Sequence, residues 1–175
     1  MIAAGPARLD RAAVLAALQA VPDPEIPTVS IVELGMVGAI EVDEAAVRVE
    51  LLPTFVGCPA LEMIQRAVAE RLAELGRPIE VTVSFATPWT SDRISPSGRE
   101  KLRRSGFAPP PHLRAGRALP MIDSLPTAGA VSDPVPCPYC GSNRTTLESV
   151  FGPTQCRSIR HCPDCRQPFE AFKPV

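Results

Sequence analysis

The sequence predicts an α+β protein, made of a two-layer α-β-β-α-β domain and a small C-terminal ribbon with four metal-binding cysteines. Three observations support this prediction. Residues 1–87 alternate helical and strand-like apolar patterns. Residues 108–135 are rich in Pro, Ala and Gly, which is typical of a linker. The last 40 residues contain two Cys-x-x-Cys pairs, a spacing typical of a zinc ribbon.

The first helix is expected to begin after Asp10, which can cap it, and to end near Val21. Its apolar stripe follows helical spacing and comprises Val14, Leu15, Leu18 and Val21. Three prolines follow within six residues, so the helix cannot continue. We therefore expect a stiff, extended loop over residues 23–27.

A hairpin is predicted next, with strands at Met36–Val42 and Ala46–Leu52. In the second strand the odd-numbered apolar residues are expected to point inward and the charged residues between them outward. The turn between the strands contains Asp43-Glu44-Ala45.

A second helix is expected from Pro59 to about Leu75, because proline suits the first helical turn and Gly76 suits the end. Its buried stripe comprises Leu61, Ile64, Val68, Leu72 and Leu75. A third strand follows, in which alternate residues are expected to face the core, namely Ile79, Val81, Val83 and Phe85.

The remainder divides into a basic helical extension at 88–107, the linker at 108–135 and the ribbon at 136–175. Residues 1–87 hold six Lys/Arg against twelve Asp/Glu, whereas residues 88–120 hold seven against two. The basic stretch has no interleaved aromatic residues. We therefore interpret it as a solvated helix face or a contact for an acidic protein surface, rather than a nucleic-acid site.

The ribbon is expected to contain a hairpin with strands at Arg144–Phe151 and Cys156–His161, and a third strand at Pro168–Lys173. A unit of this size buries too little apolar surface to fold alone, so metal binding must stabilise it. The four predicted ligands are Cys137, Cys140, Cys162 and Cys165. Zn²⁺ is the favoured metal, with iron in a rubredoxin-like site and disulfides as alternatives. Four thiolates leave no open coordination position, which indicates a structural metal.

The start of the chain shows no charged-then-apolar leader, and no apolar run approaches 18 residues. We therefore expect a cytoplasmic protein without a membrane segment. Cysteines in that compartment stay reduced, which favours metal binding over disulfides.

Cys58 is predicted at the start of the second helix, where backbone N–H groups and the helix dipole stabilise a thiolate. Gly57 allows the chain to bend there. The alternative is a small, buried and inert cysteine. Neither of the two histidines is placed to act as its base, which weakens a thiol-enzyme interpretation.

Asp23 and Glu25 lie in the stiff proline loop, where they could bind a metal or a partner or simply be solvated. Cys156 is predicted to lie at the far tip of the ribbon hairpin, because an extended strand of six residues separates it from Cys162 by roughly 20 Å. It is then either a packing residue or part of a partner-facing surface.

Residues 23–37, Asp-Pro-Glu-Ile-Pro-Thr-Val-Ser-Ile-Val-Glu-Leu-Gly-Met-Val, resemble the DPEIP-x-x-S-I-V-x-L-G-I-V segment of the MIP18/DUF59 family. Thr54-x-x-x-Cys58-Pro59 resembles the second motif of that family. The resemblance implies a MIP18/DUF59-like fold for the first domain and a link to iron–sulfur cluster assembly. Its functional edge would comprise Asp23, Glu25, Thr54 and Cys58.

With the basic helix and the ribbon added, nearly the whole chain is similar to the D-subunit family of phenylacetyl-CoA epoxidases. This resemblance implies a non-catalytic accessory role in metal-centre maturation during aerobic phenylacetate breakdown. The implied partners are the di-iron oxygenase and reductase subunits, or iron–sulfur assembly proteins. The implied cofactors are structural Zn²⁺ and a transient iron ion or iron–sulfur cluster.

Two other classes remain open. A nucleic-acid-binding ribbon protein would need a basic, aromatic face, yet the ribbon has five Lys/Arg against three Asp/Glu. A thiol enzyme using Cys58 would need a base.

Overall fold

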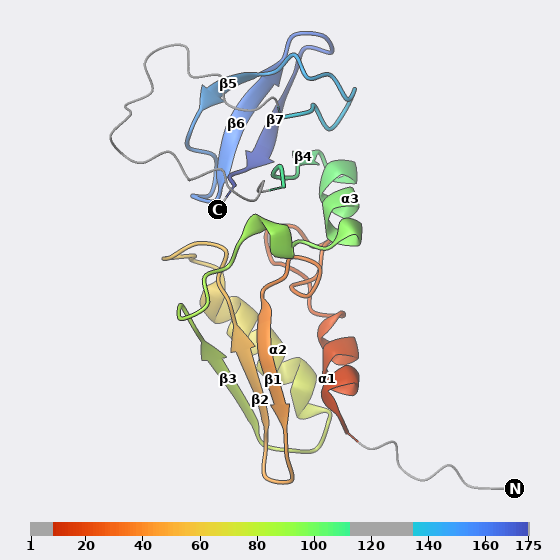
Figure 1. The fold of residues 1–175 in the computed structure, drawn as a ribbon, viewed down its shortest axis with the longest axis vertical. Coiled ribbons are helices and arrows are strands. Elements are labelled where there is room, and N and C mark those ends of the chain that lie inside the picture. The colour runs from red at the N-terminus through yellow and green to blue at the C-terminus, as the bar shows by residue number, and fades with distance from the viewer. Residues whose placement is uncertain (1–8, 113–134, 175) are drawn as a thin grey trace, which may run out of the picture. The chain divides into compact units, whose positions relative to one another are not determined.

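The computed structural model describes residues 9–112 and 135–174. These residues form two compact units, and each is described by itself (Figure 1). Unit 1 comprises residues up to Trp89 together with Arg93–Gly98. Unit 2 comprises Thr90–Asp92 and the chain from Arg99 onward. No helix among the described residues combines the length and apolar character needed to cross a membrane.

Unit 1 has the predicted α-β-β-α-β order, so this part of the predicted fold class is confirmed. Its elements are α1 (Arg11–Leu18), β1 (Val37–Val42), β2 (Val47–Leu51), α2 (Leu61–Ala73) and β3 (Ile79–Val83). The sheet order is β1-β2-β3, with β1 antiparallel and β3 parallel to β2. A parallel pair needs a crossover, and α2 provides it. α1 packs on α2 and β1, while α2 also packs on β3, which gives the two layers (Figure 1).

The core of unit 1 lies between these layers. Val14 and Leu18 of α1 are fully buried, and α2 contributes Ile64, Val68 and Leu72. β2 alternates as predicted, because its first, third and fifth residues are buried and its charged residues are only half-buried. Asp10 caps α1 as predicted by accepting the N–H of Ala13 at 2.9 Å.

Three boundary predictions for unit 1 were wrong. α1 ends at Leu18, not near Val21, because the N–H of Val21 bonds to the C=O of Leu18 in a tight turn at 3.0 Å. α2 begins at Leu61, not at Pro59, which lies in the preceding turn. Phe85 was expected to face the core but is 54 % exposed, since β3 ends two residues before it.

We call the segment Arg93–Gly98 together with Trp89 the clasp, because it binds four carbonyl groups between Glu33 and Val37. Trp89 Nε1 donates to the C=O of Leu34 at 2.8 Å, and the N–H of Ser95 donates to that of Glu33 at 2.9 Å. Arg93 donates to the C=O groups of Gly35 and Val37 at 2.9 and 3.0 Å. Unit 1 therefore includes Trp89 and Arg93–Gly98, which lie beyond residue 87, while Thr90–Asp92 belong to unit 2.

Gly35 is required in this arrangement. Its φ is +70°, and a Cβ there would lie 2.4 Å from the carbonyl oxygen of Arg93. Only glycine combines this backbone conformation with so close an approach.

Unit 2 contains a four-stranded sheet. Its strands are β4 (Phe107–Ala108), β5 (Thr146–Ser149), β6 (Arg157–Cys162) and β7 (Gln167–Phe172), in the order β4-β7-β6-β5. The β5–β6 hairpin and the third strand were predicted, whereas β4 falls in residues assigned to the extension and linker. η1 (Ser91–Arg93) and α3 (Pro96–Arg104) precede the sheet in the chain, and α3 matches the predicted basic helix.

β4 is anchored by a buried charge on β6. Arg157 is 6 % exposed, and its guanidinium lies 5.2 Å from the centre of the Phe107 ring and 2.8 Å from the carboxylate of Glu170. Stacking on an aromatic face and a carboxylate partner compensate the cost of burying this charge.

Candidate metal centre

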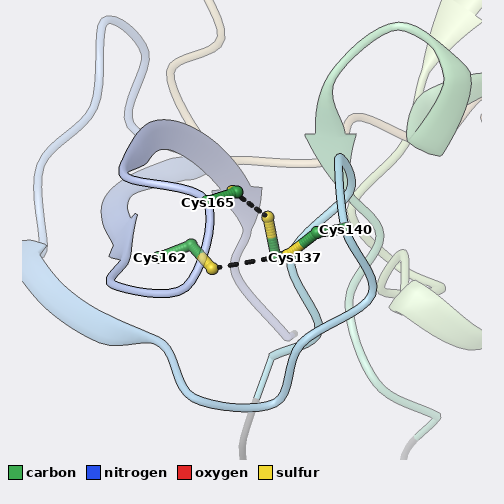
Figure 2. A group of neighbouring side chains, drawn as sticks. All are labelled: Cys137, Cys140, Cys162 and Cys165. Carbon is green, nitrogen blue, oxygen red and sulfur yellow. Dashed lines mark hydrogen bonds between the residues drawn. The ribbon is translucent and has the colours of Figure 1, made fainter.

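Four cysteines of unit 2 bring their sulfur atoms together. All four sulfurs, from Cys137, Cys140, Cys162 and Cys165, lie within 4.8 Å of one another. The Cys137–Cys165 and Cys140–Cys162 sulfur pairs are each 3.6 Å apart, and Figure 2 shows the side chains converging from two loops. These distances are too long for disulfide bonds.

The spacing of the sulfurs is close to that of a tetrahedral zinc site. A Zn²⁺ ion with four sulfurs at about 2.3 Å requires sulfur–sulfur distances of about 3.8 Å. The shortest observed distances differ from this value by only about 0.2 Å. The spacing of the four cysteines therefore suits a Zn²⁺ ion, to which each would supply one thiolate.

Backbone N–H groups orient these sulfurs. Those of Cys165 and Asp164 donate to the sulfur of Cys162, and those of Ser142 and Gln167 donate to Cys140 and Cys165. Such donors hold ligand sulfurs in place and stabilise their negative charge.

The thiols hold their protons unequally. The N–H of Cys165 is the main cause that lowers the pKa of Cys162 to about 7. Burial is the main cause that raises the pKa of Cys165 to about 12. Four thiolates at this spacing would repel one another, and a divalent cation removes that penalty.

The two Cys-x-x-Cys turns share one backbone feature, a positive φ at the residue after the second cysteine. Gly141 has φ +75° and Arg166 has φ +59°. Arg166 is the only non-glycine residue with this conformation among the described residues. The sequence could have indicated the positive φ of Arg166, because Arg166 follows Cys165 as Gly141 follows Cys140.

Polar contacts join the two turns. The side chain of Ser142 donates to the carboxylate of Asp164, and Arg144 pairs with the same carboxylate at 3.0 Å. Beneath the sulfurs, Cys137 and Cys162 belong to a buried cluster that also contains Ala108, Val135, Phe169 and Ala171. The metal site and the apolar core of the ribbon are therefore one unit, and sequence patterns did not reveal these contacts.

Cys156 lies outside the four-sulfur cluster. It immediately precedes β6, whose last residue is Cys162, so the two lie at opposite ends of the strand. Its sulfur is 3.2 Å from Oγ1 of Thr154, and its side chain is half-buried.

Cys58 lies in unit 1, in the loop between β2 and α2, and is half-buried. Its N–H donates to the C=O of Phe55 at 3.2 Å, and its C=O accepts the N–H of Leu61 at 3.3 Å. Gly57 has φ +86°, in agreement with the predicted bend. Thr54 is half-buried in the same loop.

Asp23 and Glu25 lie in the loop after α1. Oδ1 of Asp23 accepts the N–H groups of Glu25 and Ile26 at 3.0 and 2.9 Å, a turn that sequence reasoning did not foresee. Asp23 therefore shapes the loop, while the side chain of Glu25 is exposed.

Two family models match this chain. The iron-sulfur cluster assembly protein family matches residues 11–85, and the PaaD zinc beta ribbon domain matches residues 123–173. A putative D subunit of 1,2-phenylacetyl-CoA epoxidase from Escherichia coli K12 is 36 % identical over 161 residues. That alignment covers 91 % of this chain and 90 % of the relative. The chain belongs to the D-subunit family of phenylacetyl-CoA epoxidases.

Two solved structures are also similar to this member of the D-subunit family. A DUF59 domain from Bacillus anthracis is 33 % identical, with 51 % of this chain and 87 % of that chain covered and a TM-score of 0.48. A conserved hypothetical protein from Thermotoga maritima is 34 % identical, with 54 % and 94 % covered and a TM-score of 0.47. The ribbon match identifies the C-terminal unit as a zinc ribbon.

Proposed function

We propose that this chain is a non-catalytic accessory subunit of a phenylacetyl-CoA epoxidase system, and that it assists assembly of an iron–sulfur or di-iron centre in aerobic phenylacetate breakdown. The observation that carries the proposal is the alignment over 91 % of the chain with a putative D subunit of that epoxidase. The match of residues 11–85 to an iron–sulfur cluster assembly family supports the maturation role.

Within this role, Cys58 transiently holds iron or a nascent cluster, or contacts the client protein. Its half-buried position on a bent loop supports this assignment. Thr54 belongs to the same loop. Asp23 shapes the loop after α1. The exposed Glu25 in the same loop offers a carboxylate to a metal or a partner.

The zinc ribbon has a structural part in this proposal. Its four cysteines would hold Zn²⁺, which would cross-link the two Cys-x-x-Cys turns. With four protein ligands, the ion would have no coordination position left for a substrate. The clients are the di-iron oxygenase subunit, the reductase subunit or an iron–sulfur assembly protein.

The charges of the ribbon give little support to nucleic-acid binding. Arg144 pairs with Asp164, and Arg157 pairs with Glu170, so much of its positive charge is neutralised. A thiol enzyme using Cys58 would need a base, and unit 1, which contains Cys58, has no histidine.

Metal analysis of the client subunits tests the maturation role. The oxygenase and reductase subunits would be purified from cells that carry the whole system with the wild-type chain, with Cys58→Ala, or without the chain. We expect Cys58→Ala to lower the iron content of a client nearly as far as deletion does. Cys156→Ser is the matched control and should leave iron content unchanged. Full iron content together with lost epoxidase activity would instead indicate a direct part in turnover and would contradict maturation.

A further inference from the structure

β3 is the one regular open sheet edge in residues 9–112 and 135–174. The two sheets present four edge strands, β1, β3, β4 and β5. β1 and β5 each carry an irregularity in register, and β4 has only two residues. Such features protect sheet edges from pairing with other chains. β3 instead pairs with β2 over five consecutive residues without interruption, and its other edge has no described strand beside it (Figure 1).

The outward backbone groups of β3 can be assigned from its bonds to β2. The C=O of Pro78 and the N–H of Ser84 each bond to β2 at 2.9 Å. Since successive residues of a strand direct their backbone groups to opposite sides, even-numbered residues face β2. The N–H and C=O groups of Ile79, Val81 and Val83 therefore point to the open edge.

We propose that β3 pairs antiparallel with β3 of a second copy of this chain, about a twofold axis at Val81. In this register Val81 lies opposite its own copy, and Ile79 lies opposite Val83. These are the residues whose backbone groups point outward, so each opposing pair can exchange two hydrogen bonds. The three-stranded sheet then becomes one continuous six-stranded sheet. This inference does not depend on the proposed function.

The charges of β3 favour a second copy in this register. Glu80 is the only charged residue of the strand, and it lies opposite Thr82 of the second copy rather than opposite another Glu80. Glu80 is also neutralised within its own chain by Arg48 at 3.1 Å. No like charges therefore face each other across the pair.

The same register accounts for apolar side chains that remain exposed in one chain. Ile79, Val81 and Val83 are only half-buried, and they would meet their counterparts on the same face of the extended sheet.

Sedimentation of the full chain across a dilution series tests the pairing. We expect a reversible dimer. Thr82→Glu would place a carboxylate opposite Glu80 twice in each dimer and should raise the dissociation constant roughly tenfold. Thr82→Lys, at the same exposed position, should keep or tighten the dimer. Thr82 also lies beside Glu50 of β2, so Thr82→Glu adds a like-charge pair within each single chain. Thermal unfolding of each variant at low concentration therefore separates loss of pairing from loss of fold.

Amide hydrogen exchange locates the interface. The N–H of Val81 should become protected as the concentration rises, while that of Thr82, which faces β2, should be protected at every concentration. A chain that stays monomeric, a dimer weakened equally by both Thr82 variants, or a dimer without protection at Val81 would each overturn the proposal. Protection of Val81 only when a different protein is added would also overturn it, in favour of a strand donated by that protein.

Discussion

Trp89 Nε1 donates a hydrogen bond to the C=O of Leu34 at 2.8 Å, across 55 positions of sequence. Trp89 is 4 % exposed and is the only tryptophan of the chain. The bond joins the clasp to the segment that resembles the MIP18/DUF59 motif. The match to the iron–sulfur assembly family ends at residue 85, and the clasp lies beyond it. The bond therefore ties a segment outside the matched region to a motif inside it.

Trp89→Phe should destabilise unit 1 by about 1–3 kcal/mol. The change leaves the buried C=O of Leu34 without its indole donor and also creates a small cavity. Urea unfolding followed by circular dichroism measures the loss. Phe151→Leu, at a position that is 74 % exposed, is the control and should change stability by less than about 0.5 kcal/mol. Equal stability of Trp89→Phe and the wild type would show that the clasp contributes nothing.

Removal of the metal ligands should unfold the ribbon and spare unit 1. The double variant Cys137→Ser, Cys140→Ser lacks two of the four sulfurs and should lose its zinc, because two thiolates cannot complete the tetrahedral site. Elemental analysis measures the zinc. Trp89 fluorescence, which reports on unit 1, should be unchanged. A full equivalent of zinc in this variant would contradict the assigned ligands.

Cys58→Ala should leave the melting temperature nearly unchanged and reduce epoxidase activity in cells that carry the whole system. Cys58 is half-buried, so truncating it to alanine removes little packing. A structural cysteine would give the opposite pattern, with lower stability and full activity per folded molecule.

Arg166→Gly should stabilise the zinc-loaded ribbon by about 1 kcal/mol. Arg166 adopts φ +59°, a conformation that glycine adopts without strain. Gly141→Ala, at the equivalent position of the other turn, should destabilise the ribbon by a similar amount. Competition with a zinc chelator measures both changes. Destabilisation by Arg166→Gly would mean that the arginine side chain contributes more than its backbone strain costs.

Cys156 should react with a thiol reagent while zinc stays bound. Its sulfur lies outside the four-sulfur cluster and beside the hydroxyl of Thr154. Mass spectrometry of the labelled protein identifies the modified cysteine, and Cys156→Ser provides the control. Labelling only after a chelator has removed the metal would instead make Cys156 a ligand.

Local patterns were sufficient for most of the elements. The helical stripe of α2, the alternation in β2 and the Asp10 cap depend on side-chain periodicity and on hydrogen bonds within a few residues, so the sequence alone predicts them. The two Cys-x-x-Cys pairs likewise predicted the zinc ribbon, because the spacing within each pair directs both sulfurs to one ion.

Contacts between distant segments were not predictable from such patterns. The exposure of Phe85 depends on where the β2–β3 pairing stops, and the two residues of β4 form a strand only because β7 lies beside them. The burial of Arg157 requires Phe107 and Glu170 to meet from separate strands. The sequence by itself determined the order of the elements and the zinc ligands we expect, since both depend on neighbours along the chain. Only the tertiary structure decided the clasp, the β4 edge and the open edge of β3, because each depends on hydrogen bonds between residues far apart in sequence.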